Sequence, residues 1–228
     1  MITTDGWSRY NLWEHSATVL ELYTLRALGE AEEMTCSAQA AKLLSDYAEP
    51  RQTVLDVGCG TGYFYHSLRL RGIPVEYYGI DATARFIQIG RDELSRHGLS
   101  EDRLRVGRIE DMAGSVDHVV CMNVLSNLDN FYRPLERMLK MARRSVILRE
   151  SIKDGADYRY VVDAYLDGGV PLRVHVNAYD RAELRRFGDE LGFDAQEVLD
   201  ERTQGLPENV IGHSHYWTFM VFHRRKES

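Results

Sequence analysis

The sequence lacks the features that nucleic-acid-binding and membrane-spanning proteins usually show. Its 28 Lys and Arg residues are outnumbered by 35 Asp and Glu residues, which gives a formal net charge of -7 at pH 7. Proteins that bind a phosphate backbone usually carry an excess of positive charge, so nucleic acid is not expected as a partner. No apolar run reaches the roughly 18 residues that a membrane span requires, so no membrane association is expected.

Cysteine is also scarce, with three residues that lie far apart and do not show metal-ligand spacing. Reduced thiols are therefore expected, and no bound metal. The N-terminal residues lack the basic start and the apolar stretch of a secretory signal, which favours a cytoplasmic location. What the 228 residues do contain is a hydrophobic fraction of 44%, enough to fill one large core, so a single domain is predicted.

Short β-rich segments alternate with helical segments over residues 50–151. The first is TVLDV at residues 53–57, and the last is SVILRE at residues 145–150. Such alternation predicts a doubly wound, mostly parallel α/β sheet with helices on both faces, which is a Rossmann-like fold. The predicted domain has four parts: N-terminal helices that form a lid (1–49), a ligand-binding core (50–151), an excursion after the fifth strand (152–179), and a C-terminal helix with strands (180–228).

The segment VLDVGCGTG places three glycines directly behind a predicted strand. Gly58, Gly60 and Gly62 are separated by single residues, and a helix is predicted to follow them. A strand that ends in such a loop presents backbone N–H groups and the positive end of a helix dipole to a ligand. The dinucleotide fingerprint is G-x-G-x-x-G, and Tyr63 stands where its third glycine would fall, so a nicotinamide cofactor is disfavoured. Asp56, just before the loop, favours a ligand with a cationic end.

These residues resemble motif I of the class I S-adenosylmethionine-dependent methyltransferases, because VLDVGCGTG matches the form D-x-G-x-G-x-G at every position. The segments YYGIDAT, GRIEDM, VDHVVCMNVLSNL and RSVILRES resemble the motifs that follow it in that family. The resemblance implies S-adenosyl-L-methionine as the cofactor and a seven-stranded sheet whose last strand is reversed. The residues that we expect at the cofactor are Asp56, Gly58, Cys59, Gly60, Tyr63, Asp81, Ala82, Ile109, Glu110, Asp111 and Asn123.

Several matched positions leave other roles open. The resemblance assigns the ribose hydroxyls to Asp81, but an acid at this place also serves as a helix N-cap. Glu110 and Asp111 are matched to adenine contacts, or they are surface acids on a turn. Asn127 stands where the family commonly has histidine, and no N-P-P-Y or D-P-P-Y segment follows the fourth strand. The first departure disfavours an imidazole role at this position, and the second disfavours nucleobases and glutamine amides as acceptors.

Methyl transfer from a sulfonium requires mainly that the nucleophile is aligned and that water is excluded, so a catalytic base is optional. The expected acceptor is a small molecule that is methylated on oxygen or nitrogen, in a pocket formed by residues 7–26 and 152–179. His15 and His175 are the candidate catalytic bases, although a lone histidine is more often a surface or core residue. Other side chains that we consider for this pocket are Trp7, Tyr10, Trp13, Tyr158, Tyr160, Tyr165, His213 and His215.

Two other functions are compatible with a glycine loop in an α/β fold. One is a non-catalytic S-adenosylmethionine-binding partner subunit or sensor. The other is an NAD(P)-linked oxidoreductase, against which the glycine spacing argues. The intact loop, Asp81 and the long excursion together favour a methyltransferase that acts as an enzyme.

Overall fold

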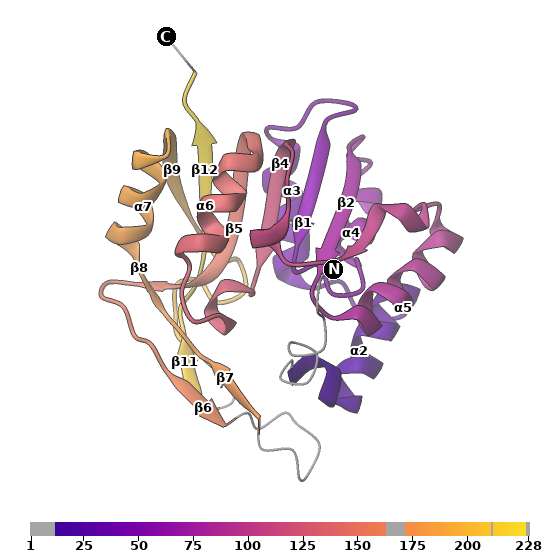
Figure 1. Cartoon of the computed structure of the whole chain (residues 1–228), viewed down its shortest axis with the longest axis horizontal. Coiled ribbons are helices and arrows are strands. Elements are labelled where there is room, and N and C mark those ends of the chain that lie inside the picture. Colours follow the sequence, from indigo (N-terminus) through magenta and orange to yellow (C-terminus); the bar gives the residue numbers. More distant parts are fainter. Residues whose placement is uncertain (1–11, 163–171, 211, 227–228) are drawn as a thin grey trace.

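A computed structural model of the chain describes residues 12–162, 172–210 and 212–226. Within these ranges, helices flank both faces of a central sheet (Figure 1). The two-residue strand β8 (Tyr179–Asp180) pairs with the end of the long central strand β5. The other strands of the sheet lie in the order β3 (Leu104–Val106), β2 (Glu76–Asp81), β1 (Thr53–Val57), β4 (Val116–Met122), β5 (Ala142–Lys153), β12 (Trp217–Arg224) and β9 (Phe193–Leu199).

The pairing of the strands confirms the predicted topology. β1 is parallel to β2 and β4, β2 is parallel to β3, and β4 is parallel to β5. β12 is antiparallel to both of its neighbours, so the reversed last strand is present. The strand order changes direction between β1 and β4, and open α/β sheets bind their ligands at the carboxyl ends of the strands that meet at such a point.

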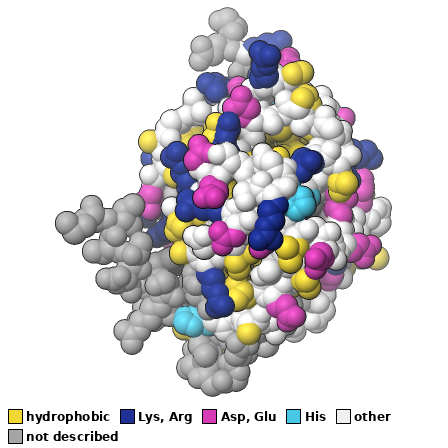
Figure 2. All heavy atoms as spheres, turned by 90° about the vertical axis from the view of Figure 1, so that its right-hand side faces the viewer, with side chains coloured by type: hydrophobic (Ala, Val, Ile, Leu, Met, Phe, Trp, Pro, Cys, Tyr) yellow, Lys and Arg dark blue, Asp and Glu magenta, His cyan; other side chains and the backbone are white. Residues whose placement is uncertain are grey.

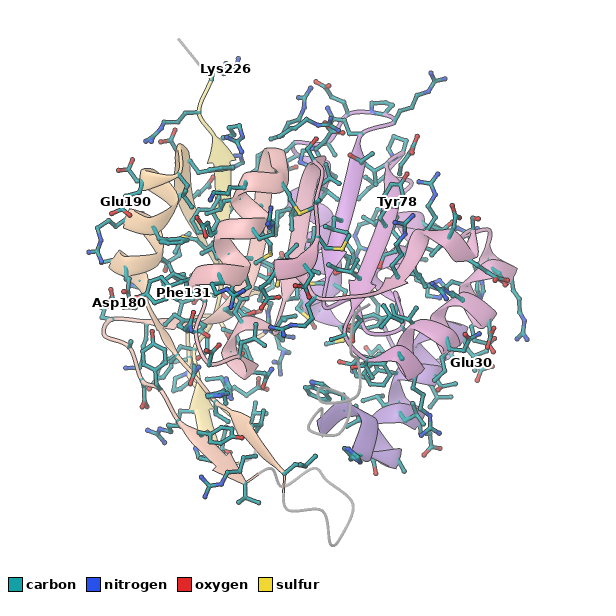
Figure 3. The ribbon with its side chains drawn as sticks, in the orientation of Figure 1. Glu30, Tyr78, Phe131, Asp180, Glu190 and Lys226 are labelled. Carbon is teal, nitrogen blue, oxygen red and sulfur yellow. The ribbon has the colours of Figure 1, made fainter. Side chains whose placement is uncertain are left out.

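Helices cover the two faces of the sheet and enclose two hydrophobic clusters. One cluster joins α3 (Thr35–Ser45), α4 (Phe64–Leu70) and α5 (Ala84–Leu94) to one face of the sheet. The other joins α6 (Tyr132–Met141) and α7 (Arg181–Glu190) to the opposite face, with Phe131 fully buried at the start of α6 (Figure 3). Because both faces are covered, the middle residues of β4 and β5 are buried whichever way they point.

Three further segments lie beyond the carboxyl ends of the parallel strands. They are α2 (Ala17–Leu28) with the preceding 3-10 helix η1 (Leu12–His15), the hairpin of β6 (Tyr160–Val162) and β7 (Arg173–His175), and the hairpin of β10 (Glu208–Val210) and β11 (His213–His215). In Figure 1, α2 and the β6–β7 hairpin lie on opposite sides of the space below the sheet. No helix in the described ranges has both the length and the apolar composition that a membrane crossing requires.

Candidate functional site

The glycine loop leaves β1 at its carboxyl end and adopts a backbone that favours glycine. Gly58 has a φ of 69° and Gly60 a φ of 57°, both in the left-handed region. The loop is tied to β2, because the backbone N–H groups of Gly58 and Cys59 both donate to the Ile80 carbonyl. A Cβ atom on Gly58 would lie 2.2 Å from Cγ2 of Val124, so the loop also packs directly against the segment that follows β4.

Asp81 ends β2 beside this loop. Its Oδ2 atom accepts a hydrogen bond of 2.8 Å from the Gly60 backbone N–H, and its Oδ1 atom accepts one of 2.7 Å from Thr83. Thr83, and not Asp81, is the N-cap residue of α5. The carboxylate therefore holds the loop and the start of α5 together at the switch point of the sheet. A carboxylate at this position is an acceptor that suits ligand hydroxyl groups.

Asp56 lies inside the protein rather than at the loop surface. Its side chain is 3% exposed, and its Oδ2 atom accepts a hydrogen bond of 2.8 Å from the Tyr77 hydroxyl. The pKa of Asp56 is raised to about 7, mainly by burial; the Tyr77 hydrogen bond lowers this pKa, and the negative charge of Asp81 raises it. Asp56 does not line the cavity described below, so the contact with a cationic ligand that we predicted remains a prediction.

The raised pKa of Asp56 predicts a pH-dependent stability. The folded protein holds this proton up to about pH 7, whereas an unfolded aspartate loses it near pH 4, so this group destabilises the fold as the pH rises. We expect Asp56→Asn to raise the free energy of unfolding by roughly 2 kcal/mol at pH 5.5 and to have little effect at pH 4. Denaturant unfolding at both pH values measures this; an equal effect at the two would contradict it.

A cavity of about 510 Å³ opens at the carboxyl ends of β1, β2 and β4. Six of the predicted cofactor residues line it: Gly58, Gly60, Tyr63, Asp81, Ala82 and Asn123. Five others do not: Asp56, Cys59, Ile109, Glu110 and Asp111. Ile109 is buried in the core on the 3-10 helix η4 (Ile109–Asp111), and the Asp111 side chain is exposed. The predicted adenine contacts of this helix remain a prediction.

Tyr23 is a cavity residue that the sequence did not identify, because its spacing indicated only the apolar face of a helix. Its ring stacks on Phe86 with 4.7 Å between centroids and 2° between planes, and it meets the edge of Tyr63 at 5.6 Å. The Arg26 guanidinium lies 5.0 Å from the centre of the Tyr23 ring. The Tyr23 carbonyl accepts a hydrogen bond of 3.0 Å from the Thr61 hydroxyl, so α2 is fastened over the glycine loop.

The other end of the cavity is formed by segments outside the central sheet. Trp13 comes from η1, Tyr160, Arg173 and His175 come from the β6–β7 hairpin, and Trp217 begins β12. The Tyr160 and His175 rings lie 4.6 Å apart, and the Arg173 guanidinium lies 5.6 Å from the centre of the Tyr160 ring. Cavity walls of this kind, mainly apolar and aromatic with a few polar groups, are typical of small-molecule sites.

The two histidines that we predicted as candidate bases do not both line the cavity. His175 lines the cavity, whereas His15 does not, although both remain candidate bases. His215 lines it as well, with a side chain that is 5% exposed, and burial is the main reason that its pKa falls to about 4. Tyr158 is exposed and packs on Tyr179 instead of lining the cavity. Three side chains that we considered lie outside the described residues: Trp7, Tyr10 and Tyr165.

Two neighbouring charged residues of β5 are buried and hold the cavity wall. Glu150 is 0% exposed, and its carboxylate accepts hydrogen bonds of 2.7 to 3.0 Å from the backbone N–H groups of three consecutive residues, Val124, Leu125 and Ser126. Arg149 is 1% exposed and forms an ion pair of 2.6 Å with Asp200, which is 0% exposed. No local signal in the sequence indicates either role, since both residues lie within an apolar strand.

A family model described as a methyltransferase domain matches residues 48–161, which is half of the chain. The chain belongs to this family. It is a class I S-adenosylmethionine-dependent methyltransferase, as the resemblance implied, and therefore an enzyme that uses S-adenosylmethionine as its cofactor. The matched residues contain the glycine loop, Asp81 and the turn after β4.

Other methyltransferases are similar to this chain in sequence or in structure. A ubiquinone biosynthesis O-methyltransferase of Saccharomyces cerevisiae is 32% identical over 83 residues, which are 35% of the chain and only 26% of the length of that relative. The structure of magnesium protoporphyrin IX methyltransferase from Synechocystis has a TM-score of 0.63 at 16% identity and covers 95% of this chain and 97% of its own. A 1,6-didemethyltoxoflavin-N1-methyltransferase from Burkholderia thailandensis has a TM-score of 0.55 at 15% identity, with 84% and 80% covered. At these identities the two structures show the shared fold.

Proposed function

We propose that this methyltransferase methylates an oxygen or nitrogen atom of a small organic acceptor. The observation that carries the proposal is the single cavity of about 510 Å³, which joins the glycine loop and Asp81 at one end to the aromatic β6–β7 hairpin at the other. Sites for small molecules typically measure about 300–1,000 Å³. A cofactor at the loop and an acceptor at the hairpin therefore share one cavity.

The residues at the loop fit the cofactor that the family uses. The bare backbone of Gly58 and Gly60 lets a ligand approach the main chain, and Asp81 offers carboxylate lone pairs to ribose hydroxyls. When bound, S-adenosylmethionine supplies a methyl group on a positively charged sulfur. The task of the chain is then to exclude water and to align the acceptor, for which Tyr23 of α2 lines the cavity beside the glycine loop and Trp13 lines it together with the β6–β7 hairpin that carries Tyr160.

The names of the relatives support both acceptor atoms. The yeast relative is an O-methyltransferase of ubiquinone biosynthesis, and the Burkholderia structure is an N1-methyltransferase that holds 1,6-didemethyltoxoflavin. Both names describe small molecules as acceptors. The yeast relative is matched over only a small part of its length, and the Burkholderia protein has a low sequence identity. These relatives therefore support a class of acceptor and not one compound.

A macromolecular acceptor is less consistent with the charge of the protein. The formal net charge is -7, and Figure 2 shows basic and acidic side chains intermixed on the face that carries α2, α4 and α5. Such a face does not provide the continuous positive surface that attracts a phosphate backbone. We therefore propose that neither nucleic acid nor a membrane surface is the partner, and that the enzyme works in the cytoplasm.

The proposal is tested with methyl-labelled cofactor. The protein is incubated with a cell extract separated into metabolites, RNA and protein, and we expect label in the metabolite fraction together with release of S-adenosylhomocysteine. Label that enters only RNA or protein would assign a different acceptor class. If none of the three fractions causes release of S-adenosylhomocysteine, the proposal is not supported.

Asp81→Asn is expected to weaken binding of S-adenosylhomocysteine about 10-fold, because a charge-assisted hydrogen bond to the ribose becomes a neutral one. Calorimetry measures the affinity. Asp102→Asn makes the same chemical change at an exposed position outside the cavity and serves as the control. Equal affinities for the Asp81 variant and the control would remove Asp81 from the cofactor site.

A further inference from the structure

Asn123 occupies a fixed position between the two ends of the cavity. It follows β4 and has a φ of 60°, a left-handed conformation that asparagine and aspartate tolerate better than most residues. Its backbone N–H donates a hydrogen bond of 2.8 Å to the Arg149 carbonyl, and its own carbonyl accepts one of 3.0 Å from the Asn127 side chain. Its side chain is half-buried and lines the cavity.

Arg149 determines which way the Asn123 amide points. Its Nη1 atom donates to Oδ1 of Asn123, while its Nε atom donates to Asp200 at 2.6 Å. A guanidinium has donors only, so the amide of Asn123 must present its oxygen to Arg149. The Trp217 ring, whose centre lies 4.6 Å from the guanidinium carbon, holds the guanidinium in place. Consequently the Nδ2 group of Asn123 turns away from Arg149.

That Nδ2 group is available to a ligand. Among the described residues, no hydrogen bond engages it, and it is not one of the buried side-chain nitrogens that lack a partner. Asn123 thus presents two N–H donors, which are complementary to a lone pair and repel an ammonium group. The amide belongs to the cavity wall, where the next residue, Val124, packs against Gly58 at the cofactor end, and Arg149, which holds the amide, lies over Trp217 at the acceptor end.

The charged groups around the acceptor end of the cavity also favour an acceptor with a lone pair over an ammonium group. Asp81 is the single carboxylate among the described residues that line the cavity, and it holds Gly60 and Thr83 at the cofactor end. The acceptor end carries the cationic Arg173 and the ring of His215, which is neutral at pH 7 because burial keeps its pKa at about 4. A cationic amine therefore finds no counter-charge there.

We propose that Asn123, oriented by Arg149, donates a hydrogen bond to the methyl-accepting atom, and that this atom is the oxygen of an acidic hydroxyl compound, such as a phenol, an enol or a carboxylic acid. The inference rests on the proposed function and narrows it from oxygen or nitrogen to oxygen. The acceptor binds as its oxyanion, and an oxygen electron pair forms the new C–O bond. The electron pair of the broken C–S bond stays on sulfur, so no proton has to be moved in the step.

Asn123→Asp tests the inference with the smallest change of shape. Aspartate tolerates the left-handed backbone and can accept the hydrogen bond from Arg149, but it replaces the N–H donors by a second carboxylate oxygen. The probes are benzoate, 4-nitrophenolate and benzylammonium, titrated into protein saturated with S-adenosylhomocysteine. We expect the natural protein to bind the two anions at least 10-fold more tightly than benzylammonium, and Asn123→Asp to abolish that preference.

Asn130→Asp is the matched control, because it adds the same charge close in sequence but outside the cavity lining. We expect it to keep the anion preference. Equal binding of anions and benzylammonium by the natural protein, no binding of any probe, or an unchanged preference in Asn123→Asp would each overturn the inference. The labelled-extract experiment separates this result from a failure of the proposed function: label in the metabolite fraction without an anion preference would overturn this inference alone, whereas label only in RNA or protein would overturn the proposed function.

Discussion

Asp200→Asn is expected to lower the free energy of unfolding by about 3 kcal/mol, because removal of one partner of a buried ion pair leaves the other charge uncompensated. Arg149 and Asp200 are 1% and 0% exposed, and the partners lie 51 positions apart in the sequence. Asparagine keeps the shape of the side chain and an oxygen that can accept the hydrogen bonds now made by Thr203. The predicted loss therefore reports on the charge of Asp200 together with the hydrogen bond that its Oδ2 atom accepts from Arg149. Denaturant unfolding measures it.

Glu190→Gln provides the control for this prediction. It removes the charge from an exposed pair with Arg186, whose closest atoms are 3.9 Å apart, and exposed pairs contribute about 0–1 kcal/mol. A double variant, Arg149→Met with Asp200→Asn, removes both buried charges and should recover part of the lost stability. If Asp200→Asn were as mild as Glu190→Gln, the pair would not be a determinant of stability.

Substitution of Asp200 should also affect acceptor binding, because its partner Arg149 connects two parts of the cavity wall. Its guanidinium reaches Asn123 on one side, and on the other it lies over Trp217, whose indole N–H donates a hydrogen bond of 2.7 Å to Glu208. The strand β12 and the turn after β4 are thus held by a single cation. A variant of Asp200 that still folds should bind acceptors less tightly.

The sequence predicts the parts of this protein that depend on local signals. Each strand and helix of the sheet has its own periodicity, and the glycine loop has a contiguous motif, so the fold and the residues Gly58, Gly60 and Asp81 could be identified one segment at a time. Asp180 is another local signal: this aspartate is the N-cap of α7, labelled in Figure 3, and its Oδ1 atom accepts a hydrogen bond of 2.8 Å from the Glu183 backbone N–H.

Contacts between distant segments were not predictable in the same way. Nothing near Tyr23 indicates that its ring lies over the glycine loop, and nothing near Arg149 indicates a partner in Asp200, because both contacts arise only when the packed elements meet. For the same reason, spacing alone could not distinguish the lining residue His175 from His15. Histidine is placed by tertiary packing, and its sequence neighbours carry little information about that packing.

Gly60→Ala is expected to weaken cofactor binding by at least about 100-fold, which is about 2.7 kcal/mol. The sequence alone suggests one reason for a glycine at this position: without a side chain, a ligand can reach the backbone. The structure adds a second reason, because a Cβ atom on Gly60 would lie 2.5 Å from Cε1 of Tyr23, and that ring is held against Phe86. The φ of 57° adds a backbone cost of roughly 1–2 kcal/mol for alanine.

Two companion variants separate these causes. Gly72→Ala has a similar φ of 61° and no atom within 4 Å of the new Cβ, so it imposes the backbone cost alone and should leave cofactor affinity unchanged. Adding Tyr23→Ala to Gly60→Ala removes the collision with the ring. If affinity for S-adenosylhomocysteine then recovers, the displaced ring caused the loss, and if it does not, the new methyl group blocks the ligand itself. A Gly60→Ala variant that binds as well as Gly72→Ala would show that the loop does not hold the cofactor, because every contact that we assign to it depends on this backbone.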